Sequence, residues 1–301
     1  MLEVIKKSIR KVLGNFFGFV FFHLYGKHLL LQKLDETKIL SIYFHNPSIE
    51  VFEMIIDWLV KHDFHIITLK EFQYTFDKKK CKHKRTVFIS FDDAWQGNME
   101  LINILKKYKV PITLFVAPKA IIDGQIWLNY VRKRFLQLSE NITEGINVRD
   151  IKNLPFSRAV ILYEAAKQIG GIKRSIMTKS QLLDFTKVAS IGSHTVNHPI
   201  LINCKDNIVL KEFNESERVL KSWGLDPNNS LAYPNGSYNE NTLTLIGKTS
   251  YKYAFTTKPQ FVELSKQSSN FEIPRICIPD SFGKYENLAR MSSVWTKIFK
   301  E

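Results

Sequence analysis

Two adjacent carboxylates follow an apolar segment in the first third of the chain. Residues 87–91 are Val-Phe-Ile-Ser-Phe, and Asp92 and Asp93 come next. Such a run is typical of a buried strand, and in parallel sheets ligands bind at the carboxyl ends of the strands. The two carboxylates are therefore placed to bind a metal or to transfer a proton. Asp is also common where a strand leads into a loop, so the pair alone leaves both interpretations open.

Two histidines form the second candidate group. His194 and His198 are four positions apart, so on a helical turn both imidazoles would lie on one face, the spacing that suits two nitrogen ligands of a divalent metal. Because the chain contains 8 histidines, such a pair also arises by chance. Gly192 before the pair and Pro199 after it mark a strand end and a turn, which favours a position at the rim of a sheet.

Together, one carboxylate and two imidazoles make a ligand set that leaves coordination positions open for water and substrate. With Asp93, His194 and His198 as ligands, Asp92 remains free to act as the general base of a hydrolase. A structural zinc site would need a fourth protein ligand, and none is evident. Zinc is the default expectation, and Co²⁺, Ni²⁺ or Fe²⁺ would accept the same donors.

The elements that position these residues alternate between strands and helices from residue 39 onward. The sequence predicts strands at 39–45, 65–69, 86–92, 112–117, 230–233, 254–257 and 274–278. It predicts helices at 49–61, 98–108, 205–223 and 239–249. This alternation indicates an α/β fold with a parallel sheet and outer helices, most economically a closed or distorted (β/α) barrel.

Residues 123–187 interrupt this alternation. The stretch is mostly helical in pattern, polar and basic, with a cluster at 132–134. We interpret it as a helical insertion at the barrel rim, which would either cover the site or form solvated surface.

Composition places the chain among globular proteins with a large core. Of its 301 residues, 45% are apolar and 24% charged, which excludes disordered and collagen-like classes and fits one large domain, at 34–301. Cys81, Cys204 and Cys277 have no disulfide-framework or zinc spacing, which fits a reducing compartment. The net charge of +14 favours anionic neighbours, but no nucleic-acid-binding signature accompanies it, so we predict no nucleic-acid partner.

Residues 1–33 differ from the rest of the chain. Basic residues precede an aromatic-rich run at 12–25, and a helix would gather one apolar stripe. The stripe consists of Ile5, Ile9, Val12, Phe16, Val20 and Leu24. This pattern favours an amphipathic extension in contact with a membrane surface; packing on the protein's own domain, a membrane span and a signal peptide are the alternatives. Without a convincing cleavage site, we predict a cytoplasmic location at the inner face of the membrane.

The order of four separated segments is similar to a known family. Phe91-Asp92-Asp93, the Ser-His-Thr-Val-Asn-His-Pro at 193–199, and the segments 231–239 and 273–276 resemble the motifs of NodB-homology polysaccharide deacetylases, the family 4 carbohydrate esterases. The resemblance covers most of residues 39–280. It implies a distorted (β/α) barrel and metal-dependent removal of N-acetyl groups from sugars, which releases acetate and a free amino sugar.

The resemblance also implies roles for individual residues. Asp92 would be the base, and Asp93, His194 and His198 the metal ligands. The segment at Tyr233 and Pro234 would line the substrate groove. The backbone N–H of Asn235 would stabilise the oxyanion. Trp95 would either stack on a sugar ring or belong to the core.

Two features depart from the common family pattern. Ala232 stands where many members have an Arg, and no histidine follows His198 to supply the general acid. A subset that resembles the poly-N-acetylglucosamine deacetylases places its acid histidine after the first strand, which fits His45, unless His45 is simply a hydrogen-bonded strand-end histidine. Arg275 would replace the missing Arg by pairing with Asp92, or else form a surface ion pair.

The sequence therefore predicts a metal-dependent hydrolase that removes N-acetyl groups from an amino sugar in a polysaccharide or glycan precursor. The same site acting on a lipid-linked sugar or another non-polymeric amide is the first alternative. A glycan-binding protein without catalysis is the second.

Overall fold

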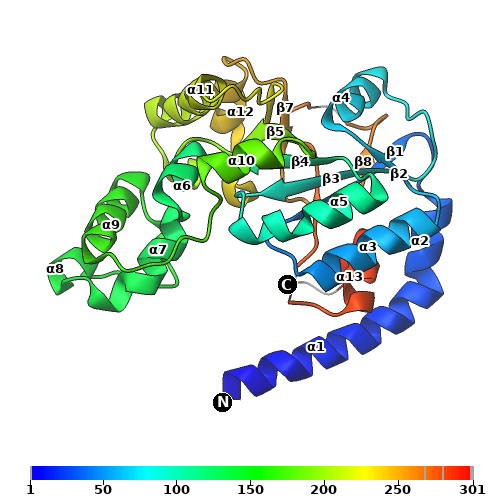
Figure 1. The fold of residues 1–301 in the computed structure, drawn as a ribbon, viewed down its shortest axis with the longest axis horizontal. Coiled ribbons are helices and arrows are strands. Elements are labelled where there is room, and N and C mark those ends of the chain that lie inside the picture. The colour runs from blue at the N-terminus through cyan, green and yellow to red at the C-terminus, as the bar shows by residue number, and fades with distance from the viewer. Residues whose placement is uncertain (1, 268, 280, 299–301) are drawn as a thin grey trace.

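The computed structural model describes residues 2–267, 269–279 and 281–298. Within these residues, nine strands form one sheet. Figure 1 shows this sheet with helices packed around it. In chain order they are β1 (Lys38–Phe44), β2 (His65–Ile67), β3 (Thr86–Asp92), β4 (Ile112–Val116), β5 (Ala189–Ser193), β6 (Ser230–Ala232), β7 (Tyr253–Phe255), β8 (Val262–Glu263) and β9 (Ile276–Cys277). Neighbouring strands follow the order β7-β6-β5-β4-β3-β1-β8, and only the pair β1–β8 is antiparallel.

The sheet curls because strands change partners along their length. β2 pairs with residues 86–88 of β3, whereas β4 pairs with residues 90–92. On β1, β8 pairs near the start and β9 near the end. The result is a half-closed, distorted barrel in a mixed α/β fold, as the sequence predicts.

Alternate strand residues face two separate apolar clusters, as the pleat requires. Ile89 of β3 faces the main cluster, into which Phe52 and Leu105 also pack. Phe88, one position earlier, faces a second cluster that contains Phe115 and Phe255. Because both faces are buried, the strands are almost continuously apolar.

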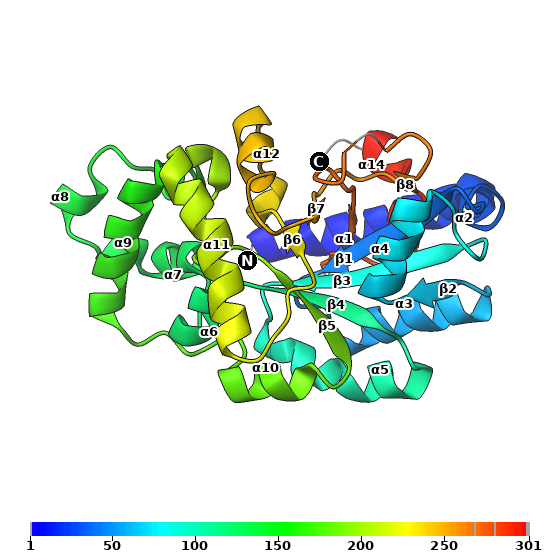
Figure 2. The same cartoon turned by 90° about the horizontal axis from the view of Figure 1, so that it is seen from above.

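Helices cover the outside of the sheet. Around the sheet lie α3 (Ile49–Lys61), α4 (Leu69–Lys78), α5 (Ile102–Tyr108), α6 (Pro118–Asp123), α10 (Lys179–Phe185), α11 (Asp206–Ser222) and α12 (Glu240–Ile246). Figure 2 shows α5 and α10 on one side of the sheet and α12 on the other. The parallel strands therefore end at one rim, where the candidate site residues are gathered.

Some observed helix and strand boundaries differ from the predicted ones, because capping residues and turns set where these elements begin and end. The predicted strand 65–69 ends at Ile67 because Thr68 caps α4 in a capping box with Glu71. The predicted helix 98–108 begins as a 3-10 turn, Gln96–Leu101, before α5. β5 was not among the predicted strands, since its sequence Ala-Ser-Ile-Gly-Ser contains little of the β-branched and aromatic character that marks strands.

The helical insertion forms a lobe with a core of its own. It contains α7 (Trp127–Arg134), α8 (Glu140–Thr143) and α9 (Phe156–Ile169), which share buried residues such as Val131 and Leu162. α10, within the predicted limits of 123–187, packs into the main core through Leu182 and Phe185 instead. In space the lobe therefore ends before residue 187.

The N-terminal residues form one long helical segment. It consists of α1 (Leu2–Phe21), a π-helical turn (Phe22–Gly26) and α2 (Lys27–Gln32). α1 runs along α13 (Lys284–Met291) (Figure 1). At its end, the Phe21 ring contacts that of Trp295 in the short helix α14 (Trp295–Ile298). Among the described residues, no helix has the length and apolar character needed to cross a membrane.

Candidate active site

The end of β3 delivers both carboxylates to the rim. Asp92 is the last residue of the strand, and Asp93 leaves it with a left-handed φ of 74°. Thr195 and His198 in the facing loop also have positive φ, of 61° and 57°. Such conformations cost free energy in residues other than glycine, and they are found where the surrounding structure holds a functional site in place.

The two histidines come from the loop after β5. Gly192 of β5 lies under the ring of Phe115, where a Cβ atom would collide with that ring. The backbone N–H of His194 then donates to Val116 of β4 over 2.8 Å, which brings the loop next to β3. The glycine is needed because of this close approach, and the loop lies beside Asp93 as a consequence.

Asp93, His194 and His198 form the candidate metal centre. Asp93 Oδ1 lies 3.2 Å from His198 Nε2 and 3.6 Å from His194 Nε2. One ligand atom from each residue fits within 4.8 Å of the others. Asp93 and His194 are buried and His198 is half-buried, so these donors face each other with little water between them.

Hydrogen bonds leave atoms of two candidate metal ligands, His194 and Asp93, available. His194 Nδ1 lies 2.7 Å from the carbonyl oxygen of Ala232, which only accepts, so Nδ1 carries the proton and Nε2 is free. Burial, the largest effect, lowers the pKa of His194 to about 4, so the ring is neutral. Asp93 Oδ1 is buried without a conventional hydrogen bond, although two imidazole nitrogens face it. These donors fit a divalent cation.

The other oxygen of Asp93 is held by Trp95. The indole N–H donates to Asp93 Oδ2 over 3.1 Å. The sequence suggested only sugar stacking or core packing for this tryptophan; here it orients a candidate metal ligand. Stacking on a sugar stays a prediction.

A buried glutamate that sequence reasoning missed holds the histidine loop. Glu212 of α11 accepts hydrogen bonds from the backbone N–H groups of Val196 and Asn197, at 3.0 and 2.8 Å, and from the Asn197 side chain at 2.6 Å. From the other side, Trp127 of the helical lobe donates to the carbonyl of His198 over 2.7 Å. Glu212 looks in the sequence like any polar residue of an amphipathic helix, so no local signal distinguishes it.

Asp92, the expected base, is paired with an arginine. Arg275 Nη1 and Nη2 donate to the two oxygens of Asp92 over 2.7 and 2.8 Å, and both side chains are buried. Arg275 also donates to Thr256 O and Ser90 Oγ. Burial alone would raise the pKa of Asp92, but the Arg275 guanidinium outweighs burial and lowers the pKa, so Asp92 stays ionised.

His45 lies just beyond the end of β1 and is exposed. Its carbonyl oxygen accepts a hydrogen bond from the Asn98 side chain over 2.9 Å. Desolvation lowers its pKa, but a hydrogen bond with Cys277 and the charges of Asp93 and Asp92 more than compensate and raise it to about 9. The ring is therefore protonated at neutral pH, as a general acid must be.

The remaining predicted residues lie in the loop after β6 and differ in their exposure to solvent. Asn235 is exposed at the rim with a φ of 56°. The Tyr233 side chain, expected to line the groove, is only 1% exposed, and its hydroxyl donates to Phe271 O over 3.1 Å. Pro234 is also buried. Both side chains are buried, and their role in lining the substrate groove stays a prediction.

Comparison with known proteins decides the family. The family model described as polysaccharide deacetylase matches residues 79–149 and 172–254. Poly-beta-1,6-N-acetyl-D-glucosamine N-deacetylase from Staphylococcus aureus (strain MSSA476) is 30% identical over 251 residues, which cover 79% of this chain and 73% of that relative. The chain belongs to the polysaccharide deacetylase family.

Solved structures share the fold of this polysaccharide deacetylase. Deacetylase PplD from Streptococcus pyogenes, solved with acetate, matches with a TM-score of 0.60 at 18% identity and covers 85% of this chain and 99% of its own. IcaB from Ammonifex degensii matches with a TM-score of 0.57 at 17% identity, over 85% and 98% of the two chains. The family resemblance and the distorted-barrel prediction are thus confirmed.

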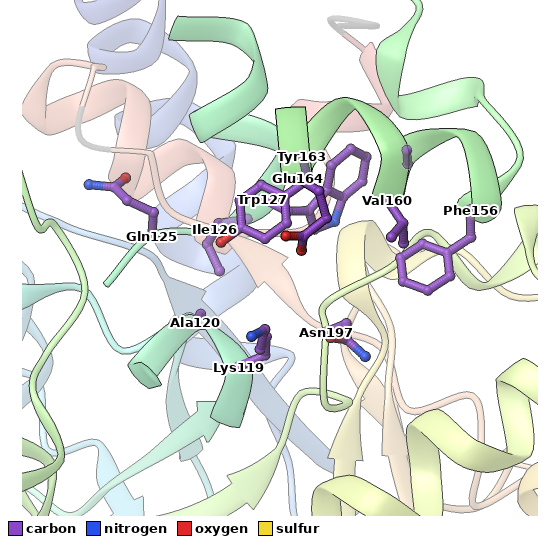
Figure 3. Close-up of a pocket in the computed structure, with 11 residues that line it drawn as sticks. Lys119, Ala120, Gln125, Ile126, Trp127, Phe156, Val160, Tyr163, Glu164 and Asn197 are labelled. Carbon is purple, nitrogen blue, oxygen red and sulfur yellow. The ribbon is translucent and has the colours of Figure 1, made fainter. Parts of the chain in front are cut away.

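The helical lobe of the polysaccharide deacetylase forms part of a pocket beside the loop that carries His194 and His198 (Figure 3). Aromatic side chains from α7 and α9 form one part of the lining, with Lys119 of α6 and Asn197 of the loop opposite. The family model omits residues 150–171, which include the whole of α9. The insertion is therefore more than solvated surface, because it forms a wall next to the candidate site.

Proposed function

We propose that this polysaccharide deacetylase is a metal-dependent hydrolase that removes N-acetyl groups from an N-acetylated amino sugar, with poly-β-1,6-N-acetyl-D-glucosamine as the first candidate substrate. The observation that carries the proposal is the buried Asp93 oxygen that faces two imidazole Nε2 atoms next to an arginine-paired Asp92. Membership of the family and the activity named for the staphylococcal relative support it.

The metal would be held by Asp93, His194 and His198, and when bound it would polarise the acetamide carbonyl and acidify a water molecule. Zinc is the first candidate, and Co²⁺, Ni²⁺ or Fe²⁺ suit the same donors. Trp95 and the Ala232 carbonyl orient two of the three ligands. The protein's part in this site is thus to fix the ligand atoms before substrate arrives.

Three other residues accept a proton, donate a proton or stabilise the oxyanion during the reaction. Asp92, kept ionised by Arg275, accepts a proton from water as the water oxygen bonds to the acetyl carbon. The backbone N–H of Asn235 donates to the oxyanion that develops on the carbonyl oxygen. His45 protonates the nitrogen as the C–N bond breaks, which releases acetate and the free amine. Each proton has a donor and an acceptor in this scheme.

Acetate release from β-1,6-linked N-acetylglucosamine oligomers tests the proposal. We expect release by the purified protein with added zinc, and loss of release with a chelator. Asp93→Ala should abolish both metal binding and activity without unfolding the protein, because the residue lies at the rim. Asp184→Ala, an exposed carboxylate on α10, is the matched control and should retain both.

The outcomes separate the alternatives. Full activity of Asp93→Ala would contradict the assignment of the metal centre. Stoichiometric metal without acetate release would move the substrate to a lipid-linked sugar or another amide. Absence of both metal and activity would favour a glycan-binding protein.

A further inference from the structure

The N-terminal helix α1 presents one face to the protein through small residues. A Cβ atom on Gly18 would lie 2.6 Å from the backbone N and Cα of Glu286 in α13, closer than real contacts allow. A Cβ atom on Gly14 would collide with the Glu286 side chain. The two glycines, four positions apart, therefore let the helices approach at backbone distance.

Polar and aromatic contacts fix the same face. Asn15 Oδ1 accepts a hydrogen bond from the Tyr285 backbone N–H over 2.9 Å. The Arg10 guanidinium lies 4.2 Å from the centre of the Phe282 ring. Phe22, which follows α1, is buried in the main core. These contacts hold the helix in one rotation about its axis.

The opposite face of α1 carries large apolar side chains that the described protein does not cover. Seven of them are between 39% and 68% exposed. They are Ile9, Val12, Leu13, Phe16, Phe17 and Val20 of α1, and Leu24 in the π-helical turn that follows. At 100° per residue the six residues of α1 fall on one continuous face, turned away from Gly14 and Gly18. A contiguous exposed apolar face of this kind marks an interaction surface.

The charge around this face has a single sign. Between Glu3 and Asp35 the sequence contains no acidic residue. The basic residues of this stretch are Lys6, Lys7, Arg10, Lys11, Lys27 and Lys33. Lys11, Lys27 and Lys33 are exposed in the structure, whereas Arg10 contacts Phe282 and Glu286 on the docked side of the helix. An apolar face among basic side chains complements an anionic lipid surface, whereas two copies of it placed together would repel each other.

We propose that α1 binds in the interface of an anionic phospholipid bilayer through this exposed face while its glycine face stays docked on α13. The helix then lies along the membrane surface, and the catalytic domain is held in one orientation above it. This inference uses none of the catalytic residues, so it stands or fails separately from the proposed function.

Vesicle flotation of the full-length protein tests the proposal. We expect the protein to float with phosphatidylcholine vesicles that contain phosphatidylglycerol, and to bind pure phosphatidylcholine more weakly. Added salt should release it in part, because it screens the lysines but not the apolar contact. The double variant Val12→Ser/Phe16→Ser removes two exposed apolar side chains and should weaken binding by about tenfold or more.

The matched control is Leu136→Ser/Ile161→Ser, which removes two exposed apolar side chains from the helical lobe. This control variant should bind vesicles as strongly as the unmodified protein does. Both double variants should have the melting temperature of the unmodified protein. Three results would overturn the proposal: no binding to anionic vesicles, equal binding by Val12→Ser/Phe16→Ser, or a lipid-free dimer that this variant converts to monomers. The last result would assign the face to a second copy of the chain.

Discussion

Arg275 and Asp92 are 183 positions apart in the chain, yet they form a bidentate ion pair of 2.7 and 2.8 Å inside the rim of the sheet. The pair arises because β9 lies parallel to the end of β1, and β1 in turn pairs in parallel with β3. Arg275 lies one residue before the start of β9, and Asp92 is the last residue of β3. Planar bidentate geometry fixes the carboxylate orientation as well as its charge.

Removal of this arginine should damage both stability and activity. Arg275→Met leaves Asp92 buried without its cation, which should lower the free energy of unfolding by about 3–5 kcal/mol. Urea unfolding measures that loss, and acetate release measures the fall in kcat/KM. In the Arg275→Met background, Asp92→Asn should restore part of the stability but no activity, because the unpaired charge is gone. A stability loss below about 1 kcal/mol for Arg275→Met would contradict the structural importance of the pair.

The pH profile should report His45. Its pKa in the folded protein, about 9, lies above the ordinary 6.5, so folding favours the protonated form. The associated stability is fully present below pH 6.5 and is lost as the pH rises through 9. Activity that needs the protonated ring should fall as the pH rises, with a midpoint between 6.5 and 9. The midpoint should lie below 9 because a bound cation would offset the charge of Asp93, which helps to raise the pKa of His45.

Cys277 provides the control for that assignment. Cys277→Ala removes the hydrogen bond to His45 and should move the alkaline limb of kcat/KM to lower pH. Cys204→Ala, a cysteine on the loop before α11, should leave the limb in place. An alkaline limb that survives in His45→Asn would assign the titration to another group.

Trp95 should tune metal affinity. Trp95→Phe keeps an aromatic ring but removes the hydrogen bond to Asp93 Oδ2, so we expect zinc to bind about 10- to 100-fold more weakly. Competition with a chromophoric chelator measures the affinity. Trp223→Phe, at the end of α11, is the control and should bind zinc normally. Unchanged affinity in Trp95→Phe would leave sugar stacking as the better account of this residue.

The contact between α1 and α13 should fail when Gly18 gains a side chain. Gly18→Val places atoms within 2.6 Å of the Glu286 backbone, so α1 must move away. Hydrogen–deuterium exchange should then accelerate in α1 and remain slow in β3 and β4. Ser8→Val, on an exposed position of the same helix, should cause no acceleration. Slow exchange of α1 in Gly18→Val would mean that close packing at Gly18 does not hold the helix.

Several predictions made from the sequence stay predictions. The compartment of the protein and the absence of a nucleic-acid partner are among them, as are the catalytic roles of His45 and Asn235. The predicted apolar stripe of residues 1–33 is exposed from Ile9 onward, whereas the side chain of Ile5 lies outside the described part of the chain. Both packing on the domain and an exposed face are therefore present, because they use different sides of one helix.

Local order could be predicted from neighbouring residues. The apolar run 86–92 predicted β3 with its exact limits, since strand periodicity is a property of adjacent positions. The spacing of His194 and His198 suggested a helical turn, whereas the structure brings both imidazoles beside Asp93 from an irregular loop. The hold of Glu212 on that loop and the burial of Tyr233 are visible only in the folded protein. Those roles depend on contacts between elements distant in sequence, and a side chain's type does not specify which distant partner it will meet.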